Sequence, residues 1–188
     1  DLSTCFRYSY GVGTGVMGVP NDDSRWGNCY GNIRATNHMF ERAVSSYTGN
    51  LADIKKELAE GHFFRAYNYF YLLKFFGGVP VVTKVLDVTS PELYGKRNSR
   101  YEVVNLILSD LDEAIAGLPL EQNITSADKG KISKQAAQAF KARVLLYEAT
   151  WRKYNGTSTD FEGSAGPASD QVNTFLEESV QLSEIVMG

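Results

Sequence analysis

Aromatic rings and planar charged side chains gather in two segments of this chain whose composition is typical of loops. The flat face of an aromatic ring can stack on a sugar ring, and planar polar groups can bind pairs of hydroxyl groups. Residues that bind ligands lie more often on loops than in helix cores. These residue types suit recognition of a carbohydrate or of a protein. The candidate ligand-binding residues are Phe6, Arg7, Tyr8, Tyr10, Asp22, Asp23, Arg25, Trp151 and Tyr154.

Both segments also have a simpler interpretation as packing. In the first, which ends at Arg25, ligand contact and plain packing account equally well for the residues. The second, residues 151–155, lies at the end of a predicted helix, and there we favour packing against the next helices over ligand contact. Trp26 begins a helical pattern, so we interpret it as a core residue rather than a binding residue.

The residue patterns of enzymes and metal sites are missing from this sequence. His38 and His62 are the only histidines, and their spacing to nearby glutamates does not match the di-iron pattern of helical bundles. No nucleophile–histidine pattern or phosphate loop is present. A glycoside hydrolase needs two carboxylates that face each other across a cleft, whereas Asp22 and Asp23 are adjacent and point apart. We therefore expect no catalytic residue, no metal and no cofactor.

Charge, hydropathy and cysteine content exclude further classes of protein. The 19 basic and 22 acidic residues give a net charge of -3 without a basic run, so nucleic-acid binding is not expected. No run of 18 apolar residues could span a membrane. Cys5 and Cys29 fit no metal-ligand spacing. A disulfide between them and two ordinary, partly buried thiols both agree with the sequence, and we favour the thiols.

Helical periodicity and helix-start residues predict an all-α fold. The predicted helices begin near residue 25, at 51, at 99 to 100, at 133 to 134 and near 170, with polar or glycine-rich segments between them. Successive helices joined by short connections form antiparallel pairs, and pairs stacked side by side resemble tetratricopeptide-like repeats. The predicted helix-capping residues are Ser24, Asn50, Ser99 with Glu102, and Ser133.

We interpret residues 1–188 as one helical-repeat domain within a longer chain, and residues 1–24 as an aromatic, glycine-rich loop at its start. The segment 77–98 is predicted to be a long loop with a short extended piece over residues 79–85. The last helix is expected to be the first half of a third pair, whose partner follows Gly188.

The segment 60–76 carries eight aromatic residues and is apolar on nearly every helical face. A helix with this pattern must be buried by neighbours on several sides, so we expect it to be the central helix of the domain. Arg65 lies within it, and Arg143 lies in an alanine-rich helix. Either arginine could bind a ligand, but because buried charges are almost always paired, we favour pairing of both with carboxylates such as Glu60 or Asp110.

Four motifs occur in the order found in one known family. The first is W-x3-Y-x2-I-x3-N over residues 26–37, and the second spans 60–80 and includes Phe-Arg-Ala and a final Gly-Gly-Val-Pro. The third covers residues 97–119, and the fourth covers 132–147. Together they resemble SusD/RagB-type nutrient-binding lipoproteins of the bacterial outer membrane, and the resemblance extends over most of residues 26–188.

The resemblance implies a surface-exposed outer-membrane lipoprotein that binds oligosaccharides or other nutrients and delivers them to a SusC-like, TonB-dependent transporter. Members of this family are not enzymes. Their lipid anchor and their carboxy-terminal half would lie outside this chain, so the chain would hold part of a ligand site. The alternative that we keep open is a tetratricopeptide-like scaffold that binds only protein partners.

Overall fold

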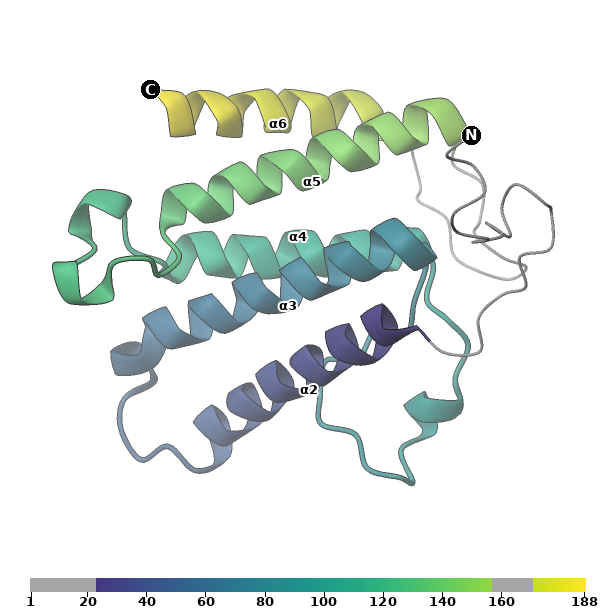
Figure 1. The fold of residues 1–188 in the computed structure, drawn as a ribbon, viewed down its shortest axis with the longest axis horizontal. Helices are drawn as coiled ribbons and strands as arrows, with labels where there is room; N and C mark the ends of the chain where they lie inside the picture. Colours follow the sequence, from purple (N-terminus) through teal and green to yellow (C-terminus); the bar gives the residue numbers. More distant parts are fainter. Residues whose placement is uncertain (1–22, 157–170) are drawn as a thin grey trace, which may run out of the picture.

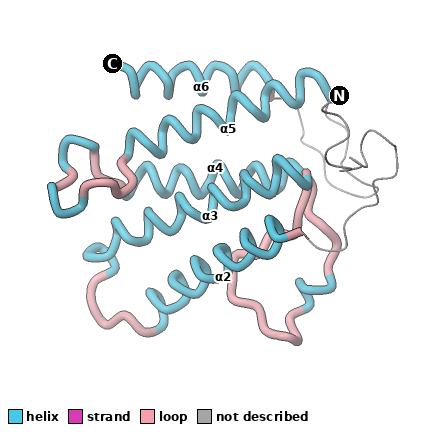
Figure 2. Tube along the Cα trace, viewed as in Figure 1, coloured by secondary structure: helices cyan, strands magenta, loops and turns pink. Residues whose placement is uncertain are grey.

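The computed structural model describes residues 23–156 and 171–188. Within these residues the chain forms α-helices and short 3₁₀ turns but no β-strand, which confirms the predicted all-α class. Successive helices run antiparallel and pack side by side in chain order (Figures 1 and 2). The helices are α2 (Ser24–Ser45), α3 (Lys55–Phe76), α4 (Arg100–Gly117), α5 (Lys134–Asn155) and α6 (Val172–Met187), and the 3₁₀ turns are η2 (Leu51–Ile54), η3 (Pro91–Tyr94), η4 (Glu121–Asn123) and η5 (Ser126–Asp128).

Helix starts follow the predicted capping residues with one exception. Ser99 and Glu102 form the predicted capping box, and Ser133 accepts a hydrogen bond from the backbone N–H of Ala136. The predicted cap Ser24 is wrong, because Ser24 already belongs to α2 and the preceding Asp23 has the extended backbone of a cap. The Asp23 carboxylate accepts the backbone N–H of Arg25 at 2.9 Å.

The loop between α3 and α4 is held by side chains from the helices. Gly77 ends α3 with a φ of +67°, a conformation that favours glycine. The hydroxyl of Tyr69 accepts the N–H of Val82 at 2.8 Å and lies 3.1 Å from its carbonyl oxygen. The Asn37 side-chain amide donates to the same carbonyl at 2.9 Å. These bonds replace strand pairing, so the extended piece predicted over residues 79–85 is not a β-strand.

Helix α3 is the central helix, as predicted, but it is not buried on every side. It packs against α2 on one side and α4 on another, and the buried rings include Phe63, Tyr69 and Phe70. Phe64 and Tyr67, however, are 46% and 48% exposed. The expectation of all-round burial is therefore wrong for this stripe, because α5 covers it only in part, through the contact of Phe140 with Tyr67.

A buried charge pair joins α3 to α4. The Arg65 guanidinium donates to both oxygens of Asp110, with Nε–Oδ2 and Nη2–Oδ1 distances of 2.8 and 2.7 Å. Its Nη1 donates to Oδ1 of Asn37 on α2 at 2.9 Å, and His62 Nδ1 lies 2.7 Å from Asp110 Oδ1. The predicted pairing of Arg65 with Asp110 is confirmed. One guanidinium thus connects three helices.

A second buried cluster was not predicted. Glu148 on α5 is fully buried and accepts Nε of Arg100 and Nε of Arg152, each at 2.9 Å. Arg143, on the same helix, is exposed and forms no ion pair with a carboxylate of the described residues. The expected pairing of Arg143 is therefore wrong. Positions 143 and 152 lie on different faces of α5, and only the second faces α4.

We expect Asp110→Asn to lower the free energy of unfolding at neutral pH by about 3–5 kcal/mol, because Arg65 would stay buried without a counter-charge. Burial acts to raise the pKa of Asp110, but the hydrogen bonds from Arg65 and His62 outweigh it, and the pKa lies below its ordinary value. Such a carboxylate contributes stability that is fully present above its unfolded-state pKa of about 4 and is lost as the pH falls through the folded-state pKa.

The measurement is urea unfolding of the parent and the variant from about pH 2 to pH 7. The unfolding free energy of the parent should fall below about pH 4, and the variant should lose this part of the pH dependence. If the unfolding free energies of the two proteins depended on pH in the same way, the charge of Asp110 would not contribute to stability.

Candidate functional site

Several of the predicted ligand-binding residues lie outside the described part of the chain: Phe6, Arg7, Tyr8, Tyr10 and Asp22. The remaining four lie at one end of the helix bundle, where α2 begins and α5 ends (Figure 1). Asp23 and Arg25 flank the start of α2, and Trp151 and Tyr154 belong to the last turn of α5. The structure brings these pairs to the same end of the bundle, but no described pocket includes both.

Asp23 and Arg25 bind each other. The Arg25 guanidinium donates to Asp23 through Nε and Nη2, at 2.9 and 2.6 Å, and stacks over the Phe75 ring at 4.4 Å. The side-chain hydrogen bond from Arg25 lowers the pKa of Asp23, so the carboxylate is ionised at neutral pH. Because Asp23 also caps α2, its local role is structural, whereas the Arg25 side chain remains 45% exposed.

Trp151 and Tyr154 differ in how they are held. The Arg100 guanidinium lies 4.1 Å from the Trp151 ring, and Trp151 is half-buried, which agrees with the favoured packing interpretation. Tyr154 is 77% exposed and is available for ligand contact. Both border a shallow groove of about 440 Å³ along α5, whose lining residues are Arg143, Leu146, Tyr147, Thr150, Trp151, Tyr154 and Asn155.

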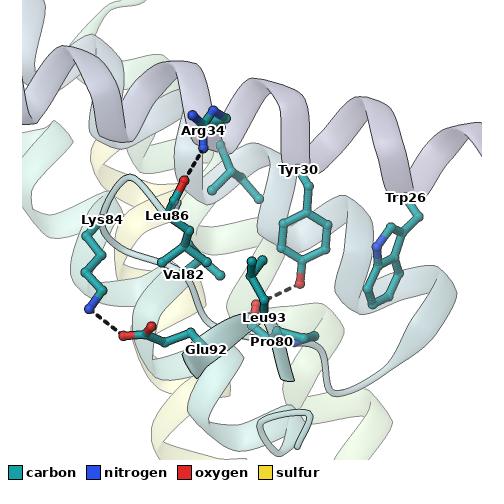
Figure 3. A pocket seen from close by; sticks show the side chains of 10 residues that line it. Trp26, Tyr30, Arg34, Pro80, Val82, Lys84, Leu86, Glu92 and Leu93 are labelled. Atoms are coloured by element: carbon teal, nitrogen blue, oxygen red, sulfur yellow. Dashed lines mark hydrogen bonds and ion pairs between the residues drawn. The ribbon is translucent and has the colours of Figure 1, made fainter. Parts of the chain in front are cut away.

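A separate pocket of about 300 Å³ lies between α2 and the loop that joins α3 to α4 (Figure 3). One wall is a face of α2, where Trp26, Tyr30 and Ile33 recur at helical spacing. The opposite wall is formed by loop residues 80–93. Its lining residues are Trp26, Tyr30, Ile33, Arg34, Pro80, Val82, Lys84, Leu86, Glu92 and Leu93, and we call it the α2–loop pocket.

Side-chain hydrogen bonds attach the loop wall to α2. The Tyr30 hydroxyl donates to the Pro80 carbonyl at 2.7 Å, and Arg34 Nη1 donates to the Leu86 carbonyl at 2.6 Å (Figure 3). Burial raises the pKa of Tyr30 far above its ordinary value, so the hydroxyl keeps its proton and remains a donor. These two hydrogen bonds hold the loop wall of the pocket against α2.

The rim of the α2–loop pocket carries opposite charges. Lys84 Nζ lies 2.5 Å from Oε1 of Glu92, and this hydrogen bond lowers the pKa of Glu92 (Figure 3). The other carboxylate oxygen, Oε2, has no hydrogen-bond partner among the described residues, although solvent scarcely reaches it. The Glu92 carboxylate therefore keeps capacity to accept a further hydrogen bond.

Trp26 has two roles in this arrangement. Its ring packs edge-on against Phe76 at 5.2 Å and against Tyr30 at 5.0 Å, and it also lines the pocket. The core interpretation of Trp26 is therefore correct in part. Sequence reasoning missed the loop residues Lys84 and Glu92, because no local pattern shows that they face α2.

The described residues also limit what else the chain can hold. Within residues 23–156 and 171–188, no group of three or more His, Cys, Asp or Glu side chains could hold a metal ion. Among the described helices, none combines the length and the apolar character that crossing a membrane requires. Cys29 is buried against the core, and burial raises the pKa of its thiol, while Cys5 lies outside the described residues.

Comparison with known proteins decides the family. A SusD-like family model, described as "Starch-binding associating with outer membrane", matches residues 19–146, more than half of the chain. The chain belongs to the SusD-like family. The resemblance drawn from the four sequence motifs is thereby confirmed. Proteins of this family are associated with the outer membrane.

Individual SusD-like proteins are similar over much of this chain. SusD-like protein P38 of Formosa agariphila is 34% identical over 108 residues, which are 57% of this chain and 20% of that protein. A SusD-like protein of Bacteroides ovatus is 27% identical over 85% of this chain and 28% of its own length. The solved structure of a laminarin-binding SusD-like protein matches with a TM-score of 0.60 and 27% identity, over 72% of this chain and 30% of that one. The chain thus spans less than a third of each relative.

We expect Tyr30→Phe to lower the free energy of unfolding by about 1 kcal/mol, because the part-buried Pro80 carbonyl would lose its donor. Thermal or urea unfolding measures this change. Tyr154→Phe is the matched control, since it removes the same hydroxyl from a side chain that is 77% exposed, and it should have no measurable effect. Equal effects of the two substitutions would contradict a role for the Tyr30 hydroxyl in holding the loop.

Proposed function

We propose that this chain is the helical-repeat part of a cell-surface protein that binds oligosaccharide and delivers it to a SusC-like, TonB-dependent transporter in the outer membrane. The observation that carries the proposal is membership of a family described as starch-binding and outer-membrane associated. The laminarin-binding relative supports a glycan as the class of ligand. The protein would act by binding alone, without catalysis, and would be attached to the membrane by a lipid anchor.

The geometry of the α2–loop pocket supports carbohydrate as the ligand. Trp26 and Tyr30 supply aromatic surface, and Arg34 and Lys84 supply donors at the rim. Glu92 supplies a carboxylate acceptor. A sugar presents apolar C–H faces and hydroxyl groups that both donate and accept, so it needs this combination of groups. A volume of about 300 Å³ suits one end or one unit of an oligosaccharide rather than a long chain.

The proposed site extends beyond this pocket. Arg25 and Tyr154 expose polar groups at the same end of the bundle, and we propose that they contribute to the glycan surface together with residues 6–22. Because the chain spans 20% and 28% of its two curated relatives, the rest of the protein would complete the site. The helical repeats would provide the surface that docks on the transporter.

The glycan-binding part of the proposal is tested with the full-length protein and a panel of polysaccharides that includes laminarin. We expect at least one glycan to bind, and we expect Trp26→Ala to weaken that binding about tenfold, or ~1.4 kcal/mol. The reason is that the ring offers stacking surface that alanine lacks. Isothermal titration calorimetry gives the affinity, and Trp26→Phe, which keeps a ring, should retain most of it.

Tyr94→Ala is the matched control for this experiment. Tyr94 follows Glu92 and Leu93 in the same 3₁₀ turn, is 81% exposed and does not line the pocket. It should leave the affinity unchanged. Failure of every glycan to bind would refute the proposed function, whereas binding that Trp26→Ala does not change would place the glycan elsewhere. Binding only to other proteins would favour the tetratricopeptide-like scaffold.

The delivery step is tested separately, by affinity purification of the tagged full-length protein from detergent-solubilised outer membranes. We expect a TonB-dependent transporter to co-purify, since a family that captures nutrients outside the cell must pass them to an importer. A membrane lipoprotein from the same preparation, carrying the same tag, is the control. Recovery of glycan-binding protein without any transporter would refute delivery and leave glycan binding intact.

A further inference from the structure

The α2–loop pocket is aromatic at one end and charged at the other (Figure 3). Trp26 and Tyr30 form the aromatic end, near the start of α2. Arg34 lies one helical turn, about 6 Å, beyond Tyr30. There its side chain donates to the Leu86 carbonyl, so the loop around Lys84 lies beside this part of α2. A ligand in the pocket would therefore contact aromatic surface and charged groups at the same time.

The charges that line the pocket do not cancel. Among the described residues, the lining contains two cations, Arg34 and Lys84, and one carboxylate, Glu92, which leaves a net charge of +1. Lys84 and Glu92 form an ion pair with each other. A third cation lies at the aromatic end, where the Arg97 guanidinium is 5.6 Å from the centre of the Trp26 ring. The electrostatic potential in the pocket is therefore positive.

Arg34 is the cation of the lining that has no counter-charge. It is exposed, and it forms no ion pair with a carboxylate of residues 23–156 or 171–188. Its Nη1 donates to the Leu86 carbonyl at 2.6 Å, which holds the guanidinium beside the pocket. A guanidinium has five N–H donors in a planar fork, so this bond leaves donors available. The fork matches the spacing of oxygens in a carboxylate or a tetrahedral oxyanion.

The carboxylates next to the pocket are already hydrogen-bonded within the protein. Asp87 Oδ1 accepts the backbone N–H and the hydroxyl of Thr89, at 2.7 and 2.6 Å. Glu102 accepts the backbone N–H of Ser99 at 2.7 Å. These hydrogen bonds lower the pKa of Asp87 and the pKa of Glu102, so both carboxylates are ionised at neutral pH and held where they are. Neither of them pairs with Arg34, and an anionic group of a ligand can take that place.

We propose that the α2–loop pocket selects glycans that contain an acidic sugar, whose carboxylate or sulfate group binds Arg34. This inference rests on the proposed glycan-binding function and adds the class of sugar. The ring of the acidic unit stacks against Trp26 and Tyr30, and its anionic group lies one helical turn further along α2. Charge-assisted hydrogen bonds are about twice as strong as neutral ones, so this group contributes most of the selectivity.

A neutral sugar fits the same pocket less well. Its hydroxyl groups can accept hydrogen bonds from Arg34, but they cannot offset the charge, and a bound ligand removes water from the guanidinium. An anion replaces that water with a counter-charge, whereas a neutral sugar leaves the charge uncompensated. Glu92 opposes an acidic ligand only weakly, because the ammonium group of Lys84 offsets its charge.

The test compares matched pairs of polysaccharides on the full-length protein by isothermal titration calorimetry. One pair is polygalacturonate and its carboxyl-reduced, neutral form, and the other is a sulfated galactan and its desulfated form. We expect the acidic member of at least one pair to bind at least about tenfold more tightly than its neutral form. The pair that shows the preference identifies the anion as carboxylate or sulfate. The preference should shrink in about 1 M salt, which screens charges in solvent.

Variants of Arg34 assign the preference to the pocket. Arg34→Gln removes the charge but keeps an amide that can donate to the Leu86 carbonyl, and we expect it to abolish the preference. Arg34→Lys keeps the charge and should retain part of the preference. Arg42→Gln is the matched control, because Arg42 is exposed in the last turn of the same helix and does not line the pocket. It should leave the preference unchanged, and urea unfolding of each variant checks that it is folded.

Each outcome decides the inference. A preference for the acidic member that Arg34→Gln abolishes and Arg42→Gln does not supports it. Equal or tighter binding of the neutral members overturns it and leaves glycan binding in place. A preference that persists in Arg34→Gln, or that Arg42→Gln reduces equally, also overturns it, because the anion would then bind elsewhere or respond to overall charge. Failure of every polysaccharide to bind refutes the proposed function itself, and the inference with it.

Discussion

The burial of the Arg65 guanidinium is the constraint on which the rest of the structure depends. A buried cation is tolerated only when its donors are satisfied, and Asp110 and Asn37 satisfy it from two different helices. The same Asn37 amide then donates to the Val82 carbonyl of the loop, at 2.9 Å. A chain of hydrogen bonds therefore runs from the centre of the bundle to the wall of the α2–loop pocket, and the position of that wall follows from the charge inside.

The second buried cluster, around Glu148, also pairs buried charges, here between α4 and α5. One carboxylate, fully buried, accepts Arg100 from α4 and Arg152 from its own helix. This fixes the Arg100 guanidinium where it stacks on Trp151, and it fixes Arg152 over the rings of Tyr101 and Phe175. Buried charges thus set the positions of aromatic rings at the end of the bundle. Removing one partner would leave an uncompensated buried charge, which is strongly destabilising.

Local patterns predicted the helices, whereas the site depends on contacts between distant residues. Periodicity and capping residues such as Ser99 and Ser133 are readable within a few positions, and the structure confirms them. In the α2–loop pocket, the Tyr30 side chain is hydrogen-bonded to Pro80, 50 residues away. In the second buried cluster, Glu148 is hydrogen-bonded to Arg100, 48 residues away. No short-range pattern encodes such pairs. The pairing of Arg65 could be predicted from the sequence because a charge on a buried helix needs a counter-charge. The apolar residues on nearly every side of α3 could not show which of its faces stays exposed.

The aromatic residues fall into three groups, and the polar groups around them distinguish these groups. Tyr69 and Phe70 lie among apolar neighbours and hold the core. Trp26 and Tyr30 stand beside both donors and a carboxylate, the mixture that sugar hydroxyl groups require. The exposed stripe of α3, formed by Phe64 and Tyr67, has no carboxylate near it in the helical segment from Gly61 to Phe76. It offers apolar area with few acceptors, which suits a protein surface better than a sugar. Ring content alone would rank this stripe of α3 first as a ligand site. The mixture of donors and acceptors is what favours the α2–loop pocket as the proposed glycan site.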